Sequence, residues 1–469
     1  MTLTLDQAVS KFGKAAKDKL NNPGAAGQPE DQLRAPLEAL VADLCVLIGP
    51  SAEDVVLVGE SALSELMTRP DYAVTRKKAL VGHIEVKAPT KGADPRKFTD
   101  KHAKTQWEKL KALPNLVYTD GQAFSLWRDG ARVGEIVTLD GDLDTAGGPL
   151  GTPPALSATA AGFLTWRPDP PTTTTQLVET TARLCRLLRD EVEEQLDRKS
   201  PALVGLMADW QQLLLPDAKE AEFADGYAQA VTFGLLMAKA RGISLSGGLD
   251  AAGKALSQTN TLIGSALKLL TEPAEEAHLL ETSIDTLVRV LDVVDWKTLS
   301  KGQPEAWLYF YELFLGQYDT KLRKKTGSYY TPPEVVTAMV RLVDEALAAP
   351  DRFNLIRGLA SPQVKLADPA VGKVTFLLGV LNRIAGTVED AEGKGSVPAA
   401  VQDALKRLIG FELQFGPFAV AQLRLLAEIA ELPEADPDKA DASHLPLYTT
   451  DPLADPDEET AWVPQSVQG

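Results

Sequence analysis

Cysteine is scarce in this sequence. The chain has two cysteines, Cys45 and Cys185, which lie 140 positions apart in apolar, helix-like contexts. Such a pair supplies neither a disulfide framework nor a cluster of zinc ligands, which excludes both kinds of cross-link. A reducing cytoplasm is the compartment that this cysteine content predicts.

Long hydrophobic runs are missing as well. No segment approaches the roughly 18 to 20 uncharged apolar residues that span a bilayer. The first 20 residues alternate lysine with apolar residues at helical spacing and lack the uninterrupted apolar core of a signal peptide. We therefore expect neither a membrane partner nor secretion.

Positive charge is in deficit overall but is concentrated locally. Over 469 residues, 48 Lys and Arg face 65 Asp and Glu, which gives a formal charge of −17. Residues 71–110 reverse that balance, with ten basic and five acidic side chains. A basic window of this kind can face a polyanion such as DNA while the rest of the chain stays acidic. Hydrophobic residues make up 44% of the chain, which excludes wholesale disorder.

Hydrophobic periodicity divides the chain into four regions. Residues 1–145 begin with helices and continue into short β-branched runs, which predicts a mixed α/β domain. Residues 146–175 are rich in Gly, Pro and Thr and are expected to form a linker. Residues 176–322 carry apolar residues at spacings of three and four, the pattern of a helical spacer. Residues 323–469 alternate strands with helices, which predicts part of a doubly wound, Rossmann-like parallel sheet.

The same patterns predict individual elements. In the first region we expect a helix over Pro29–Leu47 and strands at Val55–Val58, Ala79–Val86, Leu116–Thr119, Phe124–Arg128 and Arg132–Leu139. In the last region we expect strands at Val364–Ala367 and Leu408–Glu412, with helices at Pro333–Leu347, Val374–Ile384, Val397–Arg407 and Pro417–Ala430.

The first chemical constellation combines two carboxylates with a lysine. Ile84 and Val86 alternate with Glu85 and Lys87, so a strand here would point the charged pair to one face and the apolar pair to the other. A second carboxylate, Asp71, arrives from a neighbouring apolar stretch. Two carboxylates can hold Mg²⁺, which polarises a phosphate and lowers the pKa of a bound water, and a nearby ammonium can orient that water.

This spacing resembles the PD-(D/E)xK nuclease superfamily. Pro70-Asp71 is followed by thirteen residues and then by Glu85-Val86-Lys87. The resemblance implies a restriction-endonuclease-like α/β fold for the first region, with Asp71 and Glu85 as metal ligands. Glu-x-Lys also occurs by chance in proteins of this size, and the alternative is a solvated strand face with alternating charge.

The next predicted helix extends the resemblance. It contains Gln106, which is similar to the additional glutamine of the RecB-like members, although Leu110 stands where those often have tyrosine. Gln106 thus joins Asp71, Glu85 and Lys87 as a candidate catalytic residue. An acid from the first helix often completes the metal site in this superfamily, and both Glu30 and Glu38 are candidates.

A second constellation lies in the last region. Thr331 can cap the helix that opens at the following prolines, where free N–H groups suit a carboxylate. The segment 366–377 reads as a strand, an Asp-Pro turn and a helix. Glu412 follows Asp368 by 44 residues at the end of the next strand, where an acid can accept both ribose hydroxyls of a nucleoside cofactor.

These segments resemble motif X, motif I and the following acidic motif of N6-adenine DNA methyltransferases. Their order after a nuclease and a helical spacer is similar to that of single-chain restriction-modification enzymes, including the type ISP group. The resemblance implies double-stranded DNA as substrate and S-adenosylmethionine as cofactor. The implied cofactor-binding residues are Tyr330, Thr331, Pro332, Asp368, Pro369, Gly372, Glu412 and Asp451.

Two departures from the family pattern bear on methyl transfer. Val374 stands at the second glycine position of motif I, where its side chain obstructs close backbone approach to the cofactor. No Asn-Pro-Pro-Tyr type motif, which holds the flipped base in this family, follows Glu412 before Gly469. These departures predict a C-terminally truncated enzyme and, as a possible partner, a separate polypeptide with the remaining methylase and specificity parts.

Two functional hypotheses follow. The leading one is a restriction-modification protein: a site-specific adenine DNA methyltransferase fused to a Mg²⁺-dependent, type II-like endonuclease, with cleavage retained and methyl transfer lost or incomplete. The alternative is a truncated, catalytically inactive remnant that binds DNA or a partner.

Overall fold

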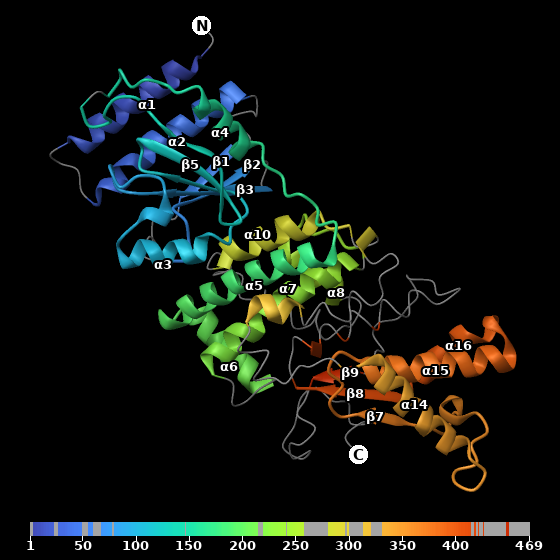
Figure 1. Ribbon diagram of the computed structural model, residues 1–469. Coiled ribbons are helices and arrows are strands. Elements are labelled where there is room, and N and C mark those ends of the chain that lie inside the picture. Colours follow the sequence, from blue (N-terminus) through green and yellow to red (C-terminus); the bar gives the residue numbers. More distant parts are fainter. Residues whose placement is uncertain are drawn as a thin grey trace. The chain divides into compact units, whose positions relative to one another are not determined.

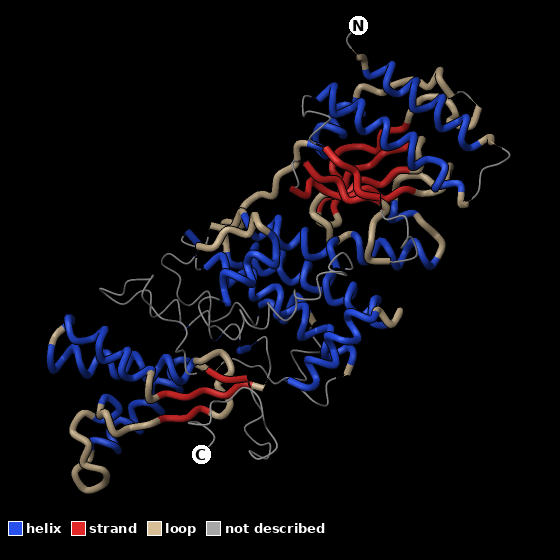
Figure 2. Tube along the Cα trace, turned by 180° about the vertical axis from the view of Figure 1, so that it is seen from behind, coloured by secondary structure: helices blue, strands red, loops and turns tan. Residues whose placement is uncertain are grey.

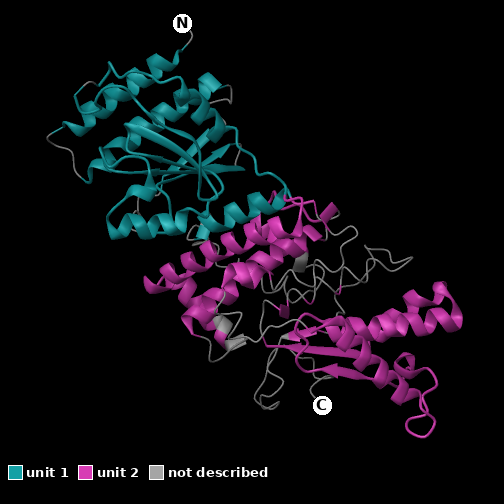
Figure 3. Ribbon diagram, viewed as in Figure 1, with its two compact units in different colours: residues 1–170, 280–293 teal, residues 171–279, 294–469 magenta. Residues whose placement is uncertain are grey.

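The computed structural model describes residues 3–22, 27–48, 55–59, 67–76, 79–145, 147–213, 219–240, 242–257, 280–295, 298–299, 313–319, 331–413, 417–418, 421, 425 and 447–449. The chain divides into two compact units, drawn in different colours in Figure 3. The first unit contains residues 1–170 and 280–293, and the second contains residues 171–279 and 294–469. Among the described residues, no helix combines the length and apolarity that crossing a membrane requires.

A sheet forms the centre of the first unit (Figure 1). It has six strands, which are neighbours in chain order. Its strands are β1 (Val55–Gly59), β2 (Tyr72–Arg76), β3 (Ala79–Val86), β4 (Leu116–Thr119), β5 (Ala123–Arg128) and β6 (Ala131–Thr138). Neighbouring strands run antiparallel except β3 and β4, which are parallel. A parallel pair needs a crossover connection, and α3 (Lys101–Leu110) lies in that connection.

Helices cover both faces of this sheet. On one face α1 (Leu5–Leu20), α2 (Pro29–Ile48) and α4 (Ala155–Leu164) enclose the apolar core, and α3 lies against the other face (Figure 2). Ile84 and Val86 belong to that core. Because side chains alternate along a strand, Glu85 lies on the opposite face, the side of α3. The predicted division of charged and apolar side chains along β3 is therefore confirmed.

The strands expected in the first unit match the structure to within one or two residues at each end. The strands at 79–86 and 116–119 have the predicted bounds, and the helix expected at 29–47 extends by one residue. Strand β2 was not among the predicted strands, since the segment after Asp71 was read only as a neighbouring apolar stretch.

Part of the expected linker is folded, which corrects the prediction for residues 146–175. Helix α4 occupies positions 155–164 and buries Leu156, Phe163 and Leu164 in the core of the first unit. Buried apolar area outweighed the local signal of glycine, proline and threonine around it.

The second unit contains a helical region and a parallel sheet. The helices are α5 (Thr174–Asp197), α6 (Pro201–Leu213), α7 (Glu220–Ala240) and α8 (Gly248–Ser257), whereas α10 (Glu281–Asp292) belongs to the first unit. The sheet consists of β7 (Leu366–Asp368), β8 (Leu408–Glu412) and β9 (Leu447–Thr449), all parallel in that order. Near it lie α14 (Pro333–Ala348), α15 (Thr375–Glu392) and α16 (Val397–Leu405).

The expected elements of this region are mostly present. Strand β8 has the predicted bounds, and β7 lies two residues later at its start than expected. Helix α15 continues eight residues past the predicted end at position 384. Most of the helix expected at 417–430 falls outside the described residues.

Candidate active site

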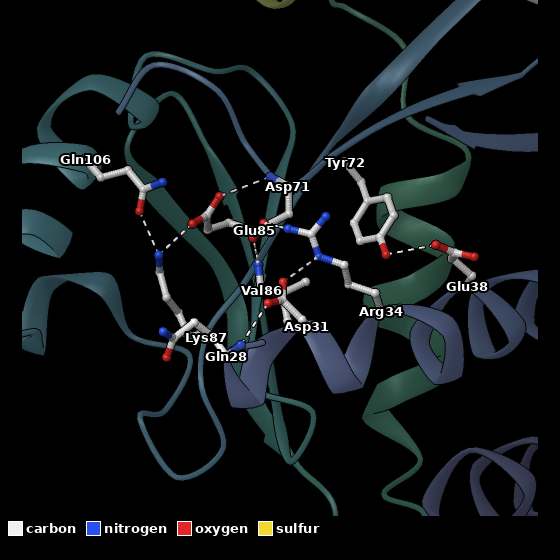
Figure 4. A network of polar contacts seen from close by, with 10 residues as sticks. All are labelled: Gln28, Asp31, Arg34, Glu38, Asp71, Tyr72, Glu85, Val86, Lys87 and Gln106. Atoms are coloured by element: carbon white, nitrogen blue, oxygen red, sulfur yellow. Dashed lines mark hydrogen bonds and ion pairs between the residues drawn. The ribbon is translucent and has the colours of Figure 1, made fainter. Parts of the chain in front are cut away.

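The pairing of β2 with β3 brings the two predicted carboxylates together. Tyr72 pairs with Ile84 in the antiparallel ladder, so Asp71 lies beside the end of β3. The backbone N–H of Asp71 donates to Glu85 Oε2 at 3.3 Å, and the N–H of Val86 donates to Asp71 Oδ2 at 2.8 Å (Figure 4). Two backbone groups thus hold both carboxylates in place.

Lys87 and Gln106 complete this group. The N–H of Lys87 donates to Thr119 O at 2.7 Å, which continues the ladder between β3 and β4. Its Nζ donates to Glu85 Oε1 at 2.5 Å and to Gln106 Oε1 at 2.7 Å (Figure 4). The four candidate catalytic residues are therefore in one hydrogen-bonded network, to which α3 contributes Gln106.

These side chains are buried, unlike those of a solvated strand face. Glu85 is 2% exposed, Lys87 is 7% exposed and Gln106 is 3% exposed. The alternative that Glu85 and Lys87 form an ordinary charged surface is wrong, because water would then surround both groups.

A polar cavity of about 90 Å³ lies beside the network. It is large enough for several water molecules, or for a cation with its waters. Its walls consist of Glu30, Arg69, Pro70, Asp71, Glu85, Val86, Lys87, Lys91, His102 and Gln106.

The structure distinguishes the two acids that the sequence left open. Glu30, in the first turn of α2, lines the cavity. Glu38 lies eight residues further along α2 and accepts a hydrogen bond from the Tyr72 hydroxyl at 2.9 Å (Figure 4). Of these two, Glu30 is the one beside Asp71 and Glu85.

Burial makes the two carboxylates hard to ionise together. Burial raises the pKa of Glu85 to about 7, with a further rise caused by the nearby charge of Asp71. Burial also raises the pKa of Asp71, against the lowering effect of the Val86 N–H and Arg34. For Lys87, burial lowers the pKa, but Glu85 and Asp71 together outweigh it and raise the pKa above its ordinary value.

The donor set fits a hard divalent cation. Oxygen ligands suit Mg²⁺, and a dication between two repelling carboxylates offsets their mutual repulsion. In the part of the chain that the structure describes, no three His, Cys, Asp or Glu side chains form a ready-made metal cluster. Mg²⁺ is usually bound through one or two carboxylates plus water and substrate phosphate, so Asp71 and Glu85 meet its needs.

Four residues in or beside the cavity were not among the predicted site residues. They are Arg34, which contacts Asp71 beside the cavity, and the wall residues Arg69, Lys91 and His102. Arg34 follows Glu30 by four positions, a spacing that places both on one side of α2. That spacing was the available signal, but only the docking of α2 on the sheet shows which side of the helix faces Asp71.

The candidate cofactor-binding residues Asp368, Gly372 and Glu412 lie near the ends of two neighbouring strands. β7 and β8 are parallel neighbours, so Asp368 and Glu412 lie near the same edge of their sheet. The N–H of Gly372 donates to Glu412 Oε2 at 3.0 Å, and the N–H of Ala370 donates to Asp368 Oδ1 at 3.2 Å. Burial raises the pKa of Asp368. The predicted turn with Asp368, Pro369 and Gly372 is thus formed next to Glu412.

Val374 stands at a position where the family pattern of the cofactor-binding turn has glycine. It precedes α15 with φ 62° and ψ 17°, a left-handed conformation that glycine adopts freely and β-branched residues rarely do. Its side chain is fully buried. The backbone has the form of the glycine turn, but a valine occupies the position where the family pattern has glycine.

Two further cofactor candidates, Thr331 and Pro332, stand at the start of α14. Pro332 is the N-cap of α14, and no side chain caps that helix, so the prediction that Thr331 would cap it is wrong. Thr331 precedes that cap and Pro369 is exposed in its turn. Tyr330 and Asp451 lie outside the described residues.

Comparisons with known proteins give one family match. The model of the family described as N-6 DNA Methylase matches residues 308–449, so this segment is similar to that family. No curated protein matches the chain.

Several solved structures are similar at low identity. A cryo-EM structure of a DrdV–DNA complex is 18% identical, with a TM-score of 0.41, and the match covers 96% of this chain and 40% of that one. A nuclease-deletion mutant of the Type ISP restriction-modification enzyme LlaGI, in complex with a DNA substrate mimic, is 17% identical, with a TM-score of 0.41 and coverage of 63% and 22%. The type IIG restriction endonuclease BpuSI is 12% identical, with a TM-score of 0.22 and coverage of 89% and 43%. This chain spans less than half the length of each of these proteins.

Proposed function

We propose that the first unit is a metal-dependent DNA endonuclease of the PD-(D/E)xK kind within a cytoplasmic restriction-modification protein. One observation carries this proposal: Asp71, Glu85, Lys87 and Gln106 converge on a single buried polar cavity. The N6 DNA methylase region in the same chain supports double-stranded DNA as the substrate.

Asp71 and Glu85 would hold the metal ion, with Glu30 on the same cavity wall. When bound, Mg²⁺ supplies Lewis acidity toward a phosphate oxygen and lowers the pKa of a water molecule. The carboxylates must be ionised to serve as ligands, and the raised pKa of Glu85 means that a proton competes for this position near neutral pH.

Lys87 acts in this scheme as a fixed positive charge. Because its pKa is raised, its ammonium stays protonated at neutral pH and does not serve as a general base. The ammonium orients the attacking water and offsets the negative charge that develops on the phosphate. Gln106 accepts a hydrogen bond from Nζ and so keeps the ammonium in one position.

Plasmid cleavage in the presence of Mg²⁺ tests the proposal. We expect the full chain to cut supercoiled double-stranded DNA and Lys87→Ala to lose that activity. Lys14→Ala is the matched control, because Lys14 is exposed on α1 and is absent from the cavity wall. Equal cutting by wild type and Lys87→Ala would remove the assignment.

For the methylase region, the proposal is that cofactor binding is impaired in this chain. The left-handed, fully buried Val374 favours this reading, whereas the Gly372–Glu412 hydrogen bond preserves the acidic end of the turn. Calorimetric titration with S-adenosylmethionine tests it. A dissociation constant on the order of 1 μM would contradict the proposal that cofactor binding is impaired.

A further inference from the structure

Among the described residues, Arg34 is the one side chain that donates a hydrogen bond to the Asp71 carboxylate. Its Nη2 donates to Asp71 Oδ1 at 3.0 Å (Figure 4). Both side chains are mostly shielded from water, at 18% exposed for Arg34 and 15% for Asp71. A charged pair at this depth is screened less than a surface pair.

Both oxygens of Asp71 are therefore engaged. Oδ2 accepts the Val86 N–H, a neutral donor that leaves the carboxylate charge uncompensated. Oδ1 accepts the guanidinium, which is a permanent cation because arginine does not deprotonate in proteins. A dication that binds Asp71 must share the carboxylate with this guanidinium or displace it, because two cations on one carboxylate repel each other.

Arg34 has a second acidic partner on its own helix. Its Nε lies 3.3 Å from Asp31 Oδ1, and the N–H of Gln28 fixes the other Asp31 oxygen at 2.9 Å. The guanidinium thus keeps an acceptor when it leaves Asp71. The Asp31 side chain is 40% exposed, so this second contact costs little desolvation.

We propose that Arg34 is a positioning residue that clamps Asp71 in the metal-free state and competes with the divalent cation for that carboxylate. The clamp holds Asp71 in place beside Glu85 before the metal arrives, and it weakens metal binding by the interaction that must be given up. This inference rests on the proposed metal site at Asp71 and Glu85.

Direct metal titration of the full chain, without DNA, tests the clamp. The probe is Mn²⁺, measured by isothermal calorimetry and repeated with Mg²⁺. We expect Arg34→Met, which keeps the aliphatic stem and removes the guanidinium, to bind Mn²⁺ about tenfold more tightly, equivalent to about 1.4 kcal/mol. Arg34→Lys keeps the charge but loses the planar fork, and its affinity is expected to fall between the two.

Lys91→Gln is the charge-matched control. Lys91 lines the same cavity but pairs with Asp100 at 3.1 Å, so its removal changes the local field without freeing Asp71. We expect this variant to tighten Mn²⁺ binding by less than about threefold. An effect as large as that of Arg34→Met would mean that general charge, not the clamp, sets the affinity, and would overturn the inference.

Asp71→Asn separates failure of the clamp from failure of the metal site. If Asp71→Asn abolishes binding while Arg34→Met and Arg34→Lys bind as wild type does, the clamp is wrong and the metal site stands. If Asp71→Asn binds as wild type does, the metal site itself is wrong and the clamp falls with it. Should Arg34→Met fail to fold, wild-type affinity in Arg34→Lys is sufficient to reject the clamp.

Discussion

Lys87 Nζ lies 2.7 Å from Oε1 of Gln106, a residue 19 positions further along the chain in the middle of the crossover helix α3. This contact joins the end of β3 to α3 and fixes an ammonium whose other hydrogen-bond acceptor among the described residues is Glu85. The rigid backbone position of Lys87 in the ladder and the rigid helix behind Gln106 together restrict where the charge can lie.

Loss of the Gln106 amide is expected to slow DNA cleavage without unfolding the first unit. In Gln106→Ala, the ammonium loses one of its two partners and its position relaxes, so we expect a decrease in rate on the order of 10²-fold. The measurement is the single-turnover rate of plasmid nicking. Glu108→Gln is the control on the same helix, since Glu108 is exposed and pairs with Lys111. Equal rates for Gln106→Ala and the control would contradict the role of this contact.

The two acids of α2 are expected to behave differently when each is replaced by alanine. Glu30→Ala should weaken Mn²⁺ binding and cleavage, because Glu30 is on the wall of the cavity. Glu38→Ala should leave both unchanged and lower the free energy of unfolding by about 1 kcal/mol, because the buried Tyr72 hydroxyl loses its acceptor. Metal titration and urea unfolding of the two variants separate these outcomes, and a reversed pattern would show that the acids have been misassigned.

Val374→Gly is expected to improve binding of S-adenosylmethionine. Glycine adopts φ 62° without the strain of about 1 to 3 kcal/mol that a side chain meets there, and it removes the obstruction at the turn. The relief of backbone strain offsets the loss of the apolar area that the valine side chain buries. We therefore expect the free energy of unfolding to change by no more than about 1 kcal/mol. Val371→Gly is the comparison, because Val371 is buried in the same turn without a left-handed backbone and should only destabilise. The affinity of each variant for S-adenosylmethionine is measured by calorimetry. An unchanged affinity in Val374→Gly would show that residue 374 does not obstruct cofactor binding.

His83 is expected to make the first unit sensitive to acid. Burial lowers the pKa of His83 from 6.5 to about 4, and within the described part of the chain neither ring nitrogen has a hydrogen-bond partner. Between those pH values the unfolded chain binds a proton that the folded chain does not, so stability is complete above about 6.5 and falls as the pH drops toward 4. The loss amounts to about 3 kcal/mol over this range.

His83→Phe removes the titration and keeps a ring of similar size. Urea unfolding at acidic and neutral pH, with the transition of the first unit assigned by pulsed hydrogen exchange of β3, measures the effect. We expect the variant to lose less stability on acidification than wild type. An equal loss of stability on acidification in both proteins would show that a group other than His83 causes it.

The alternation of apolar and charged residues in β3 was sufficient to predict the strand, its bounds and the face on which Glu85 lies, because a strand has a fixed period of two. Helix α4 could not be recognised in the same way. Its ten residues have a weak helical signal among glycines and prolines, and they fold because Phe163 and Leu164 reach a core built from distant segments.

By itself, the sequence determined the residue types of the candidate site, the strands that carry them and the unusual valine at position 374, since each depends on local spacing along the chain. Only the tertiary structure decided that Glu30 and not Glu38 faces the cavity, and that Arg34 holds Asp71. Both outcomes depend on the rotation of α2 about its axis as it packs on the sheet. The spacing of Leu33, Leu37 and Leu40 marks the buried side of α2 in the sequence, but which strand residues come to lie beside that helix depends on segments far away in sequence.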